Sequence, residues 1–161
     1  MTRTGALAVA LAFSVGAPAQ APKPFDPLAF FTGPTQGRGE LKELVGKAKR
    51  TYVQSIGRVD KDGWLILDQT VKVEGDPDRQ RRWRLKQVAP GKYRGTLSDA
   101  KGPVEAEVNG QTGHIRYVMK GGIKVEQVLT PLSGGRALSN RATFRKFGMK
   151  VATLNERIEK K

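Results

Sequence analysis

The stretch VEAEVNGQTGHIRYVM, residues 104–119, decides the fold. On both sides of its central turn, apolar and polar side chains alternate one by one, which is the period of a β-strand with one buried face. Asn109, Gly110 and Gly113 are residues that tolerate the positive φ of a tight corner. The stretch therefore predicts two antiparallel strands joined by a turn.

The same alternation continues in both directions, from Gly37 to Ile158, and is interrupted only by short turns rich in Gly, Asp, Asn and Pro. It indicates about nine or ten strands, and nothing between these limits has helical periodicity. So many twisted antiparallel strands close on themselves or fold into two layers. The sequence predicts an all-β fold, a single antiparallel meander closed into a barrel of roughly 8–10 strands, with a two-layer β-sandwich as the alternative.

The N-terminal region differs from the rest of the chain. Arg3 precedes an apolar run, and Ala17-Pro18-Ala19 has the small-x-small pattern of a cleavage site. We expect a signal peptide at residues 1–19, an extended arm with a short apolar clasp at residues 20–34, and a β-barrel domain at residues 35–161. The expected location is the periplasm. The sequence has no cysteine, so we expect neither disulfides nor a lipid anchor on an N-terminal cysteine.

The chain is strongly basic, with 29 Lys and Arg residues against 15 Asp and Glu residues and a formal net charge of +14. Such a surface attracts anions and speeds encounters with them. For an exported protein the expected polyanions are the anionic lipids of the cell envelope, and we expect no nucleic acid partner. We also expect no transmembrane span in the mature chain, because no second apolar segment follows the N-terminal one.

The densest cluster of charge and aromatic side chains is RQRRWRLK, residues 79–86. On a strand, Arg81 shares one face with Trp83, and this apolar-containing face is expected to point inward. An internal guanidinium needs a partner, because an unpaired buried charge is costly. Two interpretations stay open: Arg81 holds the anionic head group of a ligand, or it stacks on Trp83 or Tyr93 and pairs with an internal carboxylate.

Catalytic signatures are missing from the sequence. His114 is the single histidine, no serine lies in a nucleophile-elbow pattern, and no phosphate-binding glycine loop is present. Asp60-Lys61-Asp62-Gly63 resembles the start of a calcium loop but lacks the distal ligands, so a hairpin corner is favoured. We therefore expect no metal, no cofactor and no enzymatic activity; an enzyme with His114 or Tyr117 as acid or base is the remaining alternative.

The segment LSNRATFRKFG, residues 138–148, is distinctive, and it occurs together with Arg81-x-Trp83, Tyr93-x-Gly95, Asp99-x-x-Gly102 and the opening Phe25–Gly33. In this order and spacing the chain resembles the bacterial family known as domain of unknown function 3833, whose members are often described as lipoproteins. The resemblance implies an exported, lipocalin-like antiparallel barrel and no established activity. Many members carry a lipid-anchor cysteine, which this sequence lacks.

Two functional hypotheses follow. The first is a non-enzymatic binding module for an apolar or acyl ligand, such as a lipid, with an anionic head group. The second is a solid basic barrel that acts as an interaction or structural protein at the surface of the envelope. The candidate ligand contacts of the first hypothesis are Arg81, Trp83, Tyr93, Tyr117, Asn140, Arg141 and Lys146.

Overall fold

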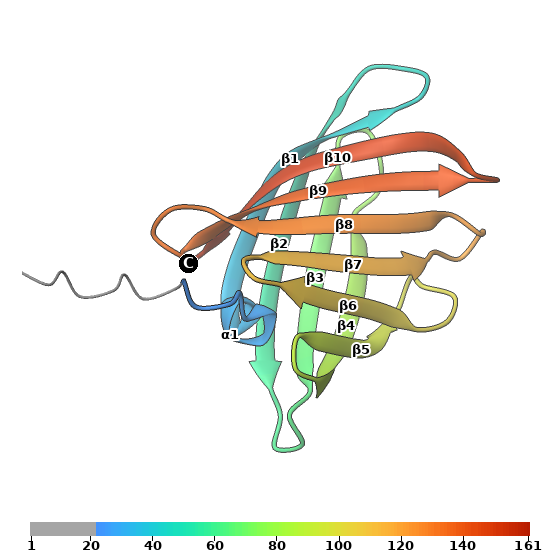
Figure 1. Ribbon diagram of the computed structural model, residues 1–161. Helices are drawn as coiled ribbons and strands as arrows, with labels where there is room; N and C mark the ends of the chain where they lie inside the picture. The colour runs from blue at the N-terminus through green and yellow to red at the C-terminus, as the bar shows by residue number, and fades with distance from the viewer. Residues whose placement is uncertain (1–21) are drawn as a thin grey trace, which may run out of the picture.

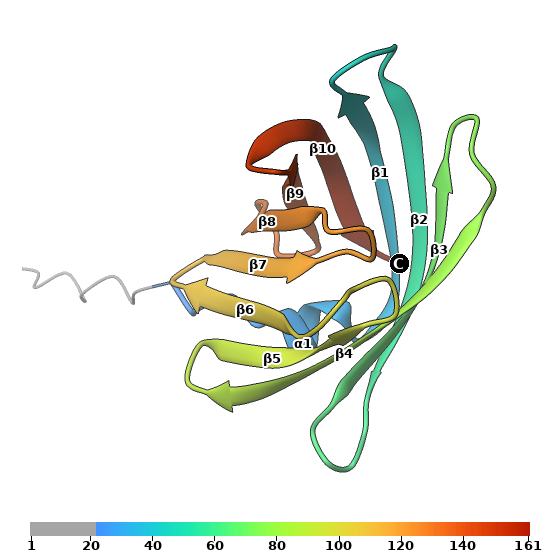
Figure 2. The same ribbon diagram turned by 90° about the vertical axis from the view of Figure 1, so that its right-hand side faces the viewer.

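The computed structural model describes residues 22–161, and these form one barrel preceded by a short helix (Figures 1 and 2). The signal peptide expected at residues 1–19 lies outside the described residues. The helix is α1 (Pro27–Phe31). The strands are β1 (Gly33–Glu43), β2 (Lys49–Val59), β3 (Leu65–Val73), β4 (Arg79–Ala89), β5 (Lys92–Leu97), β6 (Val104–Asn109), β7 (Thr112–Val118), β8 (Lys124–Pro131), β9 (Ala137–Lys146) and β10 (Met149–Lys160).

The strands form an antiparallel meander that closes between its first and last members. Each strand pairs with its neighbour in sequence, and β1 also pairs with β10 from Thr35–Lys160 to Glu43–Ala152. Closure leaves no open edge in the ladder, which removes the unpaired backbone groups that invite aggregation. The prediction of a closed, lipocalin-like barrel is confirmed, and the two-layer sandwich is not formed.

The alternation predicted from the sequence places side chains correctly on most strands. On β3 and β4, for example, Leu65, Leu67 and Trp83 are buried inside the barrel. The last strand is an exception, because a β-bulge between Lys150 and Ala152 shifts its register against β9. An extra residue reverses the faces of all residues beyond it.

The consequence of this bulge is a correction to the sequence-based pattern. An unbroken alternation would place Met149, Val151 and Thr153 on one face of this strand and Glu156 on the other. In the structure Met149 is exposed, and the buried positions of β10 are instead Glu156 and Ile158. The barrel therefore receives a carboxyl group in its interior that the simple alternation assigned to the surface.

One end of the barrel, which we call the closed end, is covered by α1 and the residues just before it. Asp26 caps the helix by accepting a hydrogen bond from the Ala29 amide at 3.1 Å, and Pro27 starts it. Phe30 and Phe31 are buried in the core, and their rings meet edge to face with centroids 5.0 Å apart. This short helix thus closes one end with aromatic side chains.

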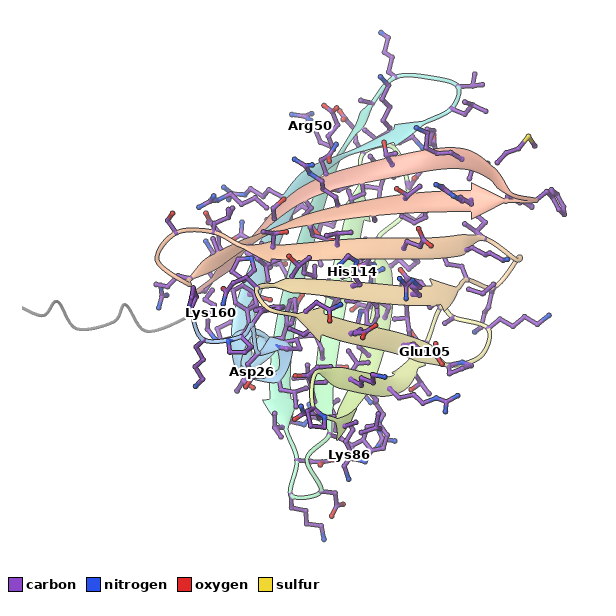
Figure 3. All side chains as sticks on the ribbon, viewed as in Figure 1. Asp26, Arg50, Lys86, Glu105, His114 and Lys160 are labelled. Atoms are coloured by element: carbon purple, nitrogen blue, oxygen red, sulfur yellow. The ribbon has the colours of Figure 1, made fainter. Side chains whose placement is uncertain are left out.

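The closed end is fastened by the last strand. Figure 3 shows Lys160 and Asp26 beside α1. The Lys160 ammonium donates to the carbonyl oxygens of Ala29, Phe30 and Thr32 at 3.0, 2.9 and 3.2 Å. A cation at the C-terminal end of a helix satisfies carbonyls that have no partner within the helix. Lys160 therefore ties α1 to β10 and to the closure of the barrel.

The opposite end, which we call the mouth, is formed by the β1–β2, β3–β4, β7–β8 and β9–β10 hairpins. In Figure 2 the β7–β8 and β9–β10 turns point toward the viewer, and α1 lies behind β6 at the far end of the barrel. Within residues 22–161, the structure contains no helix with the length and hydrophobicity needed to cross a bilayer.

Candidate functional site

A polar layer crosses the interior of the barrel between the closed end and the mouth. Its centre is the Gln69 side-chain oxygen, which accepts from Arg81 Nε and from Trp83 Nε1, each at 2.7 Å. The Gln69 amide nitrogen in turn donates to Ser55 Oγ at 2.9 Å. Inward-facing positions on three adjacent strands, β2 to β4, thus form one hydrogen-bonded network that orients the Arg81 guanidinium.

Arg81 uses only part of its donor capacity in this network. Its guanidinium carbon lies 5.5 Å from the centre of the Trp83 ring, a cation–π distance. Within residues 22–161 it forms no salt bridge and its two terminal nitrogens donate no hydrogen bond to protein. Burial lowers the pKa of Arg81, yet an arginine stays charged in a protein. The interior therefore contains a cation whose terminal donors have no acceptor in the described part of the chain.

Glu156 brings a carboxyl group into the same interior. Its Oε2 accepts from Asn140 Nδ2 at 2.9 Å, while its Oε1 and the Asn140 side-chain oxygen are buried without a hydrogen-bond partner among the described residues. The carboxyl lies against Gly37, where a Cβ atom would overlap it. Burial raises the pKa of Glu156, an effect that Asn140 and Arg81 partly oppose.

Tyr117, on β7, adds its hydroxyl group to the polar layer. Its hydroxyl accepts from Gln127 Nε2 at 3.0 Å, and its ring packs edge to face on Trp83 with centroids 5.4 Å apart. Burial is the main cause that raises the pKa of Tyr117, and the Arg81 charge opposes it. The phenol is therefore neutral at physiological pH and available as a hydrogen-bonding group near Arg81.

The space on the closed-end side of this layer is small. An inner cavity of about 60 Å³ lies between the aromatic cover and the polar layer. This volume holds roughly two waters and is far below the roughly 300 Å³ at which small-molecule pockets begin. Its walls include Phe25, Phe31, Trp83, Tyr93, Arg81 and Glu156. The inner half of the barrel is thus close to solid.

The mouth contains a much larger space. A cavity of about 720 Å³ opens there, which is within the range of ligand sites. Val71 and Arg79 line this space, while Gln69 and Arg81, one inward-facing position deeper on the same two strands, line the inner cavity. The other apolar side chains around the mouth cavity are Leu41, Leu44, Val45, Val73, Pro77, Met119, Ile123, Phe144, Val151 and Ala152.

The structure brings five of the seven candidate residues predicted from the sequence into the interior. Arg81, Trp83, Tyr93 and Asn140 line the inner cavity, and Tyr117 packs on Trp83 beside it. The remaining two residues lie elsewhere.

Arg141 and Lys146 lie on the outside of the barrel. Arg141 follows the inward Asn140 on β9 and is exposed, as the alternation of a strand requires. Lys146 ends β9 beside the β9–β10 turn and is also exposed. Neither lines the inner cavity or the mouth cavity. Their basic character in the sequence does not place them in the site.

Sequence reasoning missed Gln69 and Glu156. Gln69 had a visible signal, because it is the polar member of an otherwise apolar inward series on β3 that includes Leu65 and Leu67. Glu156 had none, since the bulge that turns it inward leaves no mark in the sequence.

The segment that begins at Asp60 and the single histidine were the features of the sequence that suggested metal binding or acid–base chemistry. Asp60 accepts from the amides of Asp62 and Trp64 at 3.0 and 2.9 Å, which makes the segment 60–64 a hairpin turn. His114 lines the inner cavity. Within residues 22–161, no three His, Asp or Glu side chains gather closely enough to hold a metal ion.

Comparisons with known proteins place this architecture among solved structures. Seven chains of known structure match significantly. One is the S-type phycobiliprotein lyase CPES from Guillardia theta, with a TM-score of 0.67 at 6% sequence identity, covering 83% of this chain and 90% of that chain. At this identity the likeness shows a shared fold. A search of curated proteins found no significant match.

The lyase corrects one prediction. The sequence led us to expect a protein without enzymatic activity, because no catalytic motif was found. A phycobiliprotein lyase is an enzyme, and it has the same barrel fold. The missing motifs therefore do not support a non-enzymatic assignment.

The sequence motifs and the barrel point to the same family. Its model, described as a protein of unknown function (DUF3833), matches residues 7–160, which is nearly the whole sequence. This range includes the interior network around Arg81 and the mouth. The chain belongs to the DUF3833 family.

Proposed function

We propose that the barrel binds an amphiphile with an anionic head group, such as a fatty acid. Its apolar body occupies the mouth cavity, and its head group reaches the polar layer at the floor of the mouth. The observation that carries this proposal is Arg81: a half-buried, inward-facing guanidinium held in place by Gln69, with terminal nitrogens that have no protein partner among residues 22–161. A carboxylate or phosphate matches the planar fork of a guanidinium.

The sizes of the two spaces support this orientation of the ligand. The inner cavity of about 60 Å³ is too small for an alkyl chain, whereas the mouth cavity of about 720 Å³ is not. Val71 and Phe144 offer apolar contact in the mouth. Arg79, which approaches Asp99 at 3.6 Å, adds a second cation between the mouth and Arg81.

Binding of a long-chain fatty acid and of the alcohol with the same chain length tests this proposal. Displacement of a fluorescent fatty acid or quenching of tryptophan emission reports the two affinities. Wild-type protein is expected to prefer the acid. Arg81→Gln is expected to weaken acid binding by about tenfold to a hundredfold, the effect of losing one to two charge-assisted hydrogen bonds, and to leave alcohol binding unchanged.

Arg84→Gln is the matched control. Arg84 lies on the same strand but on the outer face, where it stacks over Trp64 at 5.0 Å. Its loss is expected to leave both affinities unchanged. Equal binding of acid and alcohol by the wild type, or equal losses in the Arg81 and Arg84 variants, would contradict the proposal.

A further inference from the structure

The mouth is surrounded by exposed apolar side chains. Leu44 and Val45 in the β1–β2 hairpin are 75% and 83% exposed, and Phe147 and Met149 in the β9–β10 hairpin are 89% and 66% exposed. We call these four residues the mouth tips. Exposed apolar side chains concentrated on protruding turns mark a surface that meets another apolar phase.

The two hairpins are neighbours in space. The Leu44 amide donates to the Val151 carbonyl at 2.9 Å, which joins the β1–β2 turn to the start of β10. Leu44, Val45 and Val151 also line the mouth cavity. The exposed apolar rim is therefore continuous with the apolar wall of the mouth.

Phe147 is unfavourable for the folded chain in two ways. Its ring is nearly fully exposed, and its φ of 50° makes it the one non-glycine residue with positive φ within residues 22–161. Together with Gly148 at φ 81° it forms a two-residue turn with both φ values positive, which favours Asn-Gly. The contact that the ring makes is with the Lys146 ammonium, 5.7 Å from its centre, so most of the ring is open to a surface outside the barrel.

Cations surround the mouth tips. Lys42 and Lys47 flank the first hairpin, and Lys146 and Lys150 flank the second; all four are exposed. Within the described part of the chain none of the four forms a salt bridge, whereas nearby Glu43 pairs with Lys49 at 3.6 Å. Apolar tips between unpaired lysines complement a layer that is anionic at its surface and apolar beneath it.

We propose that the mouth docks on the surface of an anionic phospholipid bilayer, with the mouth tips inserted at the boundary between head groups and acyl chains and the four lysines against lipid phosphates. A second copy of this chain fits less well, because its own lysines would face these. The proposal goes beyond ligand binding and holds whether or not the barrel takes up an amphiphile. If it does, docking places the mouth cavity directly against the acyl chains.

The test is co-sedimentation of the full chain with vesicles of phosphatidylcholine alone or mixed with phosphatidylglycerol. All variants keep the same residues 1–21, so differences between variants report on the barrel. Binding is expected with the anionic vesicles, is expected to fall as salt rises, and is expected to be weak on phosphatidylcholine. Replacing Lys146 and Lys150 by Gln is expected to weaken binding about fivefold for each lysine.

Phe147→Asn separates docking from folding. Asparagine suits the positive φ of this turn, so the variant is expected to be at least as stable as wild type while vesicle affinity falls about tenfold or more. Ile56→Asn is the matched control, because Ile56 is 60% exposed on β2 away from the mouth tips, and it is expected to leave vesicle binding unchanged. Tryptophan emission of Phe147→Trp is expected to shift to the blue on anionic vesicles.

Three results would overturn the proposal. The first is equal binding to both vesicle types. The second is an equal effect of the Phe147 and Ile56 variants. The third is a dimer in analytical ultracentrifugation that Phe147→Asn dissolves, which would assign the mouth tips to a second copy of the chain.

Discussion

At the scale of single residues, Glu156 is a buried carboxyl that makes stability depend on pH. Its folded-state pKa is raised by burial above an ordinary value near 4.5, so the unfolded chain loses this proton first as pH rises. Between the unfolded and the raised folded pKa, the folded state binds more protons and stability falls with increasing pH. The contribution of Glu156 to stability is thus largest in acid.

We expect Glu156→Gln to increase the free energy of unfolding at neutral pH, by about 1.4 kcal/mol for each unit by which the pKa of Glu156 is raised. The glutamine keeps an oxygen that accepts from Asn140. The gain should vanish below about pH 4.5. Urea unfolding of wild type and variant between pH 4 and pH 8 measures it.

Glu159→Gln is the matched control on the same strand. Arg157 beside it lowers the pKa of Glu159, so this carboxylate contributes stability above its ordinary pKa and loses it in acid. The two variants are expected to change the pH profile in opposite directions. A Glu156 variant less stable than wild type at pH 7 would contradict the burial argument.

Lys160 is a second residue whose role is specific. Its ammonium bonds three carbonyl oxygens at the end of α1, and Lys160→Met is expected to lower the free energy of unfolding by about 1.5–3 kcal/mol, the range for hydrogen bonds to a charged group. Lys124→Met, at an exposed lysine of β8, is expected to change it by less than about 0.5 kcal/mol. Urea unfolding compares the two, and equal losses would show that Lys160 contributes only its charge.

The sequence revealed some of these residues and not others. The inward positions of Arg81 and Trp83 were predictable, because both lie at alternate positions of a regular strand together with buried neighbours. Lys160 was not, because its three acceptors are carbonyls from residues about 130 positions earlier, and no local pattern encodes that distance. Contacts made through backbone atoms of remote segments are the part of the structure that alternation cannot predict.

At the scale of elements, the docking of α1 depends on a glycine in β2. A Cβ atom at Gly57 would overlap the carbonyl oxygen of Phe31, so only glycine lets the helix approach the strand this closely. The clasp itself was predictable from its apolar residues and its Gly-Pro stop, whereas this close contact was not. Close approach of backbone to backbone has no signature beyond the glycine itself.

We expect Gly57→Ala to push α1 outward and to lower the free energy of unfolding by about 1–3 kcal/mol, the usual effect of overpacking. Gly113→Ala is the comparison at the same end of the barrel. There the nearest atom to a new Cβ is Phe25 Cε1 at 3.3 Å, a side-chain atom that can move. Urea unfolding is expected to show a clearly smaller loss for the Gly113 variant, and the reverse order would contradict this account of how the closed end packs.

At the scale of the whole molecule, the two ends of the barrel differ in how much of their surface is buried. The closed end contains Phe25, Phe30 and Phe31 together with buried leucines, whereas residues 42–48 at the mouth are all exposed. The sequence predicted closure, since ten alternating strands need it, but not the asymmetry between a solid inner half and an open mouth. That asymmetry comes from α1 and the β10 bulge, and the alternation within a single strand predicts neither of them.

Hydrogen exchange followed by mass spectrometry is expected to report this asymmetry. Local opening free energies range from near zero in loops to the global value in the core, so the amides of residues 42–48 and 147–149 should exchange first and those of β3 around Leu65 and Leu67 last.

A fatty acid at 100 times its dissociation constant should add about 2.7 kcal/mol to the free energy of global unfolding. Its local protection should appear around Val71 and Phe144 in the mouth. Exchange at equal rates along the chain, or protection confined to the closed end, would mean that the mouth is not the region left open for a ligand.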